Sequence, residues 1–178
     1  MVDSNICLKT PLGEVFLSSD WSSAQEEYRT KIRTELYKKT KDASFLDLEK
    51  IPESDKFFVS ISHCKSLGGY ALHLKKKIGF DVEEISRIKP EVIKRISTDK
   101  DREIFKEESS QFLWVIKEAA FKLMSGVVDV MTEVEVETLD KVGERSYLGT
   151  LSVKDIKADF LCGEVGEGCI FSLVKSEA

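Results

Sequence analysis

The sequence predicts a mixed fold of helices and antiparallel strands, the α+β class. Three short apolar segments between residues 57 and 83 are separated by polar turns, which is typical of strands joined in a meander. Two longer segments, at about residues 22–41 and 110–124, repeat apolar side chains every three to four positions and so indicate helices. After Gly126 the chain alternates apolar and polar residues again, which predicts further strands.

Composition excludes several classes of protein. The hydrophobic fraction of 42% and the charged fraction of 33% are typical of a globular protein, and no apolar run approaches the roughly 20 residues that span a bilayer. The net charge of −5 argues against a general nucleic-acid binder. The first residues lack a signal-peptide pattern, so we expect a cytoplasmic protein with free thiols. Its cysteines are Cys7, Cys64, Cys162 and Cys169.

The first 56 residues predict a hairpin, a helix and an irregular link. Pro11 and Gly13 place a turn between strands at residues 6–9 and 14–17. Ser22 or Ser23 is expected to cap a helix of about 20 residues. Residues 45–56 then form the link to the meander.

The central region predicts more helix. Residues 86–107 are expected to be helical with a break near Ser97, where Thr98 caps the next segment, and Ser109 or Ser110 is expected to cap the helix that follows. Strands are expected at residues 130–137, 147–153 and 169–174, with glycines between 163 and 168 marking a turn.

Two acids share one face of a predicted strand at residues 78–83. Period-two geometry places Asp81 and Glu83 together, opposite Phe80 and Val82. Carboxylates this close repel each other, so a lysine, an arginine or a metal ion is expected beside them. The alternative is that the strand frays and both acids are solvated.

A third acid lies on the apolar helix. Glu118 precedes Lys122 by one turn, which is either an ordinary surface ion pair or part of a site. Asp81, Glu83 and Glu118 could converge on Mg²⁺, whose ligands are oxygens and which shares its shell with substrate phosphates. Lys117 and Lys122 could hold those phosphates. Of the two histidines, His63, next to Ser62 at a strand end, is the better functional candidate.

Three motifs in this order resemble the 4′-phosphopantetheinyl transferases, in particular their larger, single-chain branch. They are Ile-Ser-His at residues 61–63, Gly-x-Asp-x-Glu at 79–83 and Trp-x-x-Lys-Glu-x-x-x-Lys at 114–122. The resemblance covers residues 57–125 well and the first 56 residues poorly. It implies two halves related by a pseudo-twofold axis, each with a small antiparallel sheet and a long helix. We expect one domain with halves at about residues 1–77 and 78–178.

The resemblance also implies a reaction. The family transfers the phosphopantetheine arm of coenzyme A to a serine of an apo acyl or peptidyl carrier protein and releases 3′,5′-ADP. Asp81, Glu83 and Glu118 would bind Mg²⁺, Glu118 would also accept the serine proton, and Lys122 would stabilise the phosphates with help from Lys117. By the same analogy, Ser62 and His63 would contact the 3′-phosphate end of the nucleotide. The single-chain branch is usually monomeric, so we expect a monomer, and from charge and composition we expect no nucleic-acid or membrane partner.

One part of the family pattern is absent. Larger members carry a Gly-Lys-Pro-like segment before the Ser-His strand, where this chain has Glu-Lys-Ile-Pro-Glu at residues 49–53; Arg29, Lys31 and Arg33 are candidate substitutes. The basic stretch at residues 87–106 is a candidate docking surface for an acidic carrier. Two other functions use the same residues: a non-catalytic module that binds coenzyme A or a carrier protein, and a Mg²⁺-dependent hydrolase of nucleotide pyrophosphates.

Overall fold

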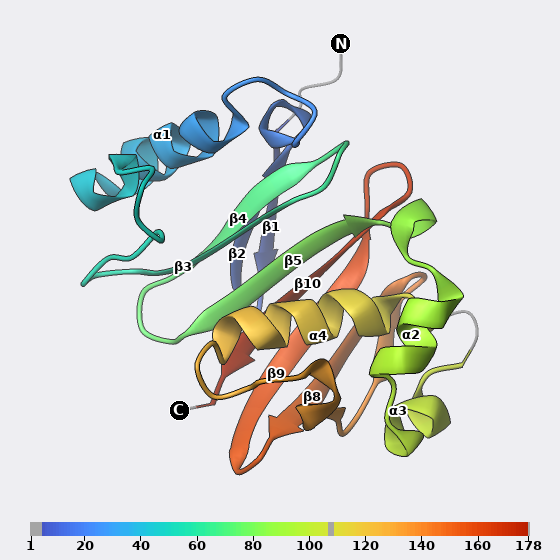
Figure 1. The fold of residues 1–178 in the computed structure, drawn as a ribbon. Coiled ribbons are helices and arrows are strands. Elements are labelled where there is room, and N and C mark those ends of the chain that lie inside the picture. The colour runs from blue at the N-terminus through green and yellow to red at the C-terminus, as the bar shows by residue number, and fades with distance from the viewer. Residues whose placement is uncertain (1–4, 107–108, 178) are drawn as a thin grey trace.

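The computed structural model describes residues 5–106 and 109–177 and forms two antiparallel sheets, each packed with a long helix (Figure 1). The first sheet has the strand order β1-β2-β4-β3. Its strands are β1 (Asn5–Thr10), β2 (Gly13–Ser18), β3 (Phe58–His63) and β4 (Gly68–His73). Helix α1 (Tyr28–Thr40) packs on this sheet through Ile32 and Leu36, which contact Tyr70 and Phe45 in one apolar cluster.

The second sheet is built from the rest of the chain, in the order β5-β10-β9-β8-β6, with β7 beside β8. Its strands are β5 (Ile78–Glu84), β6 (Val134–Val136), β7 (Asp140–Gly143), β8 (Ser146–Val153), β9 (Ile156–Val165) and β10 (Cys169–Ser176). The helices of this part are α2 (Pro90–Ile96), α3 (Asp99–Ile104) and α4 (Phe112–Leu123). Short 3₁₀ helices lie at Ser19–Trp21, Ala43–Leu46, Ile85–Arg87 and Met131–Glu133.

The apolar clusters define the layers. Phe80 and Val82 of β5 pack with Val15 and Leu17 of β2, so one face of the second sheet is buried against the first sheet. The opposite face of the second sheet packs on α4 through residues such as Val174. The layer order is therefore α1, first sheet, second sheet, α4 (Figure 1). The predicted α+β fold class is confirmed.

The predicted three-stranded meander is wrong in one respect. β4 is bonded to β2 on one side and β3 on the other, so it has no free edge for β5. β5 instead pairs with β10, with Asp81 opposite Ser172. The alternation of faces was nevertheless predicted correctly, because Phe80 and Val82 are in the apolar cluster between the sheets.

Both long helices begin later than predicted. α1 begins at Tyr28 because Ser23 serves another contact, in which its backbone amide and Oγ donate to the Cys64 carbonyl at 2.9 and 3.0 Å. α4 begins at Phe112, and Gln111 rather than a serine occupies its N-cap position. The expected cap at Thr98 is confirmed: Thr98 precedes α3, and its hydroxyl accepts from the Asp101 amide in the first turn.

α4 lies unusually close to β5. A Cβ atom at Gly79 would lie 1.9 Å from the Ala119 carbonyl oxygen, so only glycine permits this approach. The close contact brings the polar side chains of α4 within reach of the acids on β5. Within the described residues, none of the helices is both long and apolar enough to cross a membrane.

Candidate functional site

Serine side chains join the two sheets where β3 meets β5. The Phe80 amide donates to Ser60 Oγ at 2.9 Å, and Ser62 Oγ donates to Asp81 Oδ1 at 2.7 Å. Both serines point to the same side of β3, as the period-two pattern predicts. These bonds fix Asp81 at the junction of the sheets, where it is only 6% exposed.

Lys122 reaches the same junction from α4. Its Nζ donates to Asp81 Oδ1 at 2.8 Å, to Ser62 Oγ at 3.0 Å and to the Phe80 carbonyl at 3.2 Å. Its side chain is 32% exposed, whereas the Asp81 side chain is 9% exposed. Lys122 is therefore the link between a buried carboxylate and solvent.

Glu118 and Glu83 add two more carboxylates to this junction. Burial raises the pKa of Glu118, and the negative charges of Asp81 and Glu83 raise it further, while Lys122 opposes the rise. Burial likewise raises the pKa of Glu83, against its bonds from the Glu84 amide and Arg87. The structure thus brings together the three predicted acids closely enough for their charges to interact, with too little positive charge to balance them.

The chemistry of these donors fits Mg²⁺. Within residues 5–106 and 109–177, no three His, Cys, Asp or Glu side chains are gathered closely enough to form a complete metal site. Mg²⁺ is commonly held by one or two carboxylates together with substrate phosphates, so a complete protein cage is not required. Carboxylate oxygens are the ligands this ion prefers, and Asp81, Glu83 and Glu118 supply more negative charge than Lys122 and Arg87 balance.

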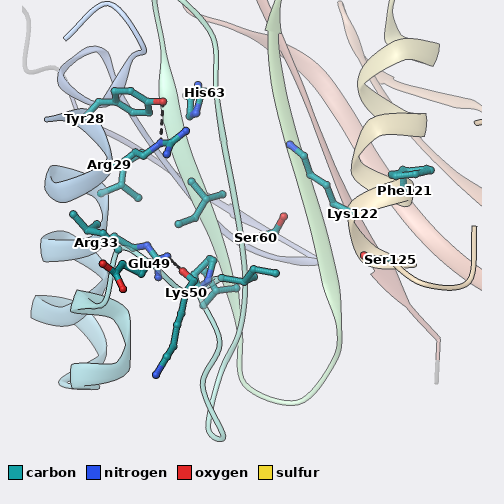
Figure 2. Close-up of a pocket in the computed structure, with 16 residues that line it drawn as sticks. Tyr28, Arg29, Arg33, Glu49, Lys50, Ser60, His63, Phe121, Lys122 and Ser125 are labelled. Carbon is teal, nitrogen blue, oxygen red and sulfur yellow. Dashed lines mark hydrogen bonds between the residues drawn. The ribbon is translucent and has the colours of Figure 1, made fainter. Parts of the chain in front are cut away.

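A pocket of about 640 Å³ adjoins these acids at Lys122 (Figure 2). One wall comes from α1 and residues 48–52, another from β3, and a third from α4. Lys122 lines the pocket and bonds Asp81, so it connects the pocket to the acids. The polar and charged residues of the lining are Tyr28, Arg29, Arg33, Glu49, Lys50, Ser60, His63, Lys122 and Ser125.

His63 lies in this pocket against an aromatic ring. The Tyr28 and His63 rings meet edge to face with centroids 4.5 Å apart, and Arg29 Nε donates to the Tyr28 hydroxyl at 3.2 Å (Figure 2). Burial lowers the pKa of His63, and the nearby charges of Arg29 and Lys122 lower it further. His63 is therefore a neutral, hydrogen-bonding side chain in a basic surrounding.

Arg33 supplies an incompletely paired cation to the pocket wall. It is 7% exposed, and its Nη2 donates to the Lys50 carbonyl. Its Nη1 is buried and has no hydrogen-bond partner in the part of the chain that the structure describes. Burial lowers the pKa of Arg33 without making it neutral at ordinary pH, because arginine ionises far above that range. Together with Arg29, Lys50 and Lys122, Arg33 makes the pocket suitable for an anionic ligand.

Lys117 does not join the site. Its side chain is fully buried, and Nζ donates to Asp101 Oδ2 at 2.6 Å and to the Ile96 carbonyl at 2.9 Å. Asp101 also accepts from the Thr98 and Val136 amides. The expectation that Lys117 contacts phosphates was wrong, because one residue along a helix turns the side chain by about 100° to another face.

Ser62 also differs from its expected position. It bonds Asp81 and Lys122 rather than lining the pocket, so it positions the acid side of the site. Tyr28 was not predicted as a site residue. Tyr28 and Arg29 lie one helical turn before Ile32 and Arg33, so the helix period could have placed all four beside the pocket. Of the three basic candidates in the N-terminal part, Arg29 and Arg33 line the pocket and Lys31 does not.

Part of the chain matches a known protein family. A family model described as the 4′-phosphopantetheinyl transferase superfamily matches residues 77–161, slightly less than half of the chain. The matched range includes Asp81, Glu83, Glu118 and Lys122, whereas His63 and the α1 side of the pocket lie outside it. A comparison with curated proteins gave no match.

Proposed function

We propose that the protein transfers the 4′-phosphopantetheine arm of coenzyme A to a serine of an apo carrier protein, in a Mg²⁺-dependent reaction, because residues 77–161 match the family model of the 4′-phosphopantetheinyl transferase superfamily. The other product is 3′,5′-ADP. The observation that carries this proposal is the placement of three carboxylates and Lys122 at the edge of a basic pocket.

The pocket is assigned to the nucleotide of coenzyme A. Its volume suits a nucleotide, and Arg29, Arg33 and Lys50 supply cations on the α1 side. Neutral His63 can donate or accept a hydrogen bond beside the Tyr28 ring. In this placement the pyrophosphate lies near Lys122, between the basic wall and the acids.

Each residue at the junction has a separate task. Asp81, Glu83 and Glu118 would hold Mg²⁺, which when bound neutralises charge on the pyrophosphate. Lys122 Nζ would stabilise the phosphoryl oxygens as charge develops on them. Glu118 would accept the proton of the carrier serine, and its raised pKa makes it a better base than an exposed glutamate. The serine oxygen then forms a bond to the phosphorus of the arm, and the bond from that phosphorus to the departing 3′,5′-ADP breaks.

The carrier protein is assigned to the surface beside α4. The exposed basic residues on and before α2 are Arg87, Lys89, Lys94 and Arg95, of which Lys94 and Arg95 lie in the last turn of the helix. Acidic partners are attracted to such a surface by charge complementarity. We further propose that the protein acts as a monomer in the cytoplasm, with the halves 1–77 and 78–178 forming one domain.

The test incubates the purified protein with coenzyme A, Mg²⁺ and a panel of apo acyl and peptidyl carrier proteins, and measures the intact mass of each carrier. Transfer adds the phosphopantetheine arm to one serine of a carrier and releases one 3′,5′-ADP for each arm added. A carrier whose acceptor serine is replaced by alanine is the matched control.

Two results would contradict the proposal. Release of 3′,5′-ADP without a carrier, at an unchanged rate, would identify a pyrophosphate hydrolase. Binding of coenzyme A with no mass gain on any carrier would identify a non-catalytic module.

A further inference from the structure

Two cysteines from different sheets meet beside the candidate site. Cys64 directly follows β3 of the first sheet, and Cys169 begins β10 of the second sheet. Their Sγ atoms are 3.9 Å apart although the residues are 105 positions apart in the chain. Cys64 is fully buried and Cys169 is 3% exposed. The pair is therefore preassembled in the fold.

The backbone around the pair is held firmly. The Cys64 amide donates to the Leu67 carbonyl at 2.7 Å, and the Cys64 carbonyl accepts both bonds from Ser23. On the other side, Cys169 is held in the antiparallel ladder opposite Glu84 of β5 and Val165 of β9. Both sulfur atoms are thus presented from fixed positions, and no large backbone movement is needed to bring them together.

The pair also adjoins the candidate site on both sheets. Cys64 follows His63, which lines the pocket, and Cys169 pairs with Glu84, which follows Glu83. Ser23, bonded to Cys64, belongs to the segment that leads into α1 and its pocket residues. A covalent change at these thiols would act on the two sheets at the end where the site lies.

We propose that Cys64 and Cys169 are a thiol-oxidation site, at which a peroxide converts the pair to a disulfide that cross-links the two sheets. In the first step the Cys64 thiolate attacks the O–O bond, giving a Cys64 sulfenic acid and hydroxide. Cys169 then attacks the Cys64 sulfur and forms the S–S bond, and the sulfenic oxygen leaves as water. Two thiols are oxidised and one hydrogen peroxide is reduced to two waters.

The surroundings support these roles. The Cys169 thiol hydrogen-bonds to Cys64 and thereby lowers the pKa of Cys64, against the effect of burial, and the Ser66 amide acts in the same direction. Ser66 Oγ lies 3.2 Å from Cys169 Sγ and is on an exposed residue, so Ser66 marks the solvent side of the pair. Cys162 is also buried, but its surroundings raise the pKa of its thiol through burial, and it has no such neighbour within the described residues.

The test maps thiols in the intact wild-type protein. The protein is treated with hydrogen peroxide, quenched, unfolded and alkylated, and then measured by intact mass and by peptide mapping. We expect a species with two fewer alkylated thiols, a peptide linkage between Cys64 and Cys169, and full reversal by dithiothreitol. Exposed Cys7 is the internal reference for the reagent. Cys162→Ser is the matched control and should give the same linkage.

Two variants test whether the linkage depends on Cys64 itself. Cys64→Ser should remove the linkage, and Cys169 should then remain alkylated; Ser66→Ala, which changes only the neighbouring hydroxyl, should retain the linkage. The proposal is overturned if Cys64 and Cys169 stay fully alkylated under conditions that oxidise Cys7, or if Cys64 ends as a sulfinic acid without a linkage. Because the readout is thiol chemistry, failure of the proposed transferase activity would leave it unaffected.

Discussion

The two sides of α4 differ in how fully their charged side chains are paired and buried. On one side, Lys117 and Asp101 form a 2.6 Å ion pair with both side chains fully buried, and further bonds satisfy each partner. On the other side, Lys122 faces Asp81, with Glu118 and Glu83 nearby and partly exposed. One side has one lysine for one acid, whereas the other has two cations, Lys122 and Arg87, for three acids.

The difference separates charges that are fully paired within the fold from charges that remain available to a ligand. A buried pair that is fully hydrogen-bonded has no capacity left for a ligand, and it fixes how α3, β6 and α4 are placed. On the other side, burial raises the pKa values of Glu83 and Glu118, and these carboxylates stay charged only where solvent or a cation reaches them. Lys117 and Glu118 are adjacent in α4 but thus lie on different sides of the helix, in different electrostatic surroundings.

The largest effect is expected for Glu118→Gln. The amide keeps the shape of the side chain but cannot accept the serine proton or bind a cation as a carboxylate does, so the transfer rate should fall about 10²–10⁴-fold. Initial rates of carrier modification measure this. Glu144→Gln, in the exposed turn between β7 and β8, is the control and should leave the rate unchanged. Unchanged transfer by Glu118→Gln would remove Glu118 from the mechanism.

The next largest effect is a loss of stability in Lys117→Met. The variant leaves Asp101 buried without its cation, which should lower the free energy of unfolding by about 3–5 kcal/mol. Urea denaturation measures the change. The double variant Lys117→Met/Asp101→Asn should recover part of the loss because it removes the unpaired charge. A loss below about 1 kcal/mol, comparable to a surface pair, would contradict the structural role.

Lys122→Gln should affect activity more than stability, the reverse of Lys117→Met. Transfer should fall about 10²–10³-fold, since a cation at the phosphates is lost, while the unfolding free energy should fall less than in Lys117→Met because Lys122 is partly exposed. Rates and urea curves on the same preparations test both statements. Lys122→Arg should keep part of the activity. If Lys122→Gln were as unstable as Lys117→Met, the contrast between the two sides of α4 would fail.

The smallest effect concerns pH. Burial and neighbouring acids raise the pKa of Glu118 in the folded protein above its unfolded value, so its contribution to stability is fully present below the ordinary glutamate pKa and is lost as pH rises through the folded pKa. Without Mg²⁺, Glu118→Gln should therefore melt at a higher temperature than the wild type at pH 7. The difference should vanish near pH 4, where both side chains are neutral; a lower melting temperature at pH 7 would contradict the direction of this pKa shift.

Local patterns predicted what depends on neighbours in the chain. Alternation on β5 separated Phe80 and Val82 from Asp81 and Glu83, and the turn residues at Thr98 predicted the start of α3, because both depend on residues within one turn or one strand. The partner of β5 could not be predicted in this way, since β10 lies about ninety residues later and nothing local selects it. β9 was missed although its burial alternates along the strand, which is a local pattern.

The same distinction applies to the site. The spacing predicted that the three acids and Lys122 lie on definite faces of a strand or helix, and in the structure Lys122 bonds Asp81 with the charges of Glu83 and Glu118 nearby. The partner of Lys117 was not predicted, because Asp101 lies on another helix and only tertiary packing brings the two side chains together. The basic wall at Arg29 and Arg33 was named as a candidate, but its contact with the Lys50 carbonyl depends on the loop conformation.

The most direct test of the central claim is a calorimetric titration of coenzyme A with and without Mg²⁺, in the wild type and in Asp81→Asn. Mg²⁺ should strengthen coenzyme A binding to the wild type, and this gain should be largely lost in Asp81→Asn while binding without Mg²⁺ stays similar. The same gain from Mg²⁺ in both proteins would show that the carboxylates at the junction of the two sheets do not hold the ion.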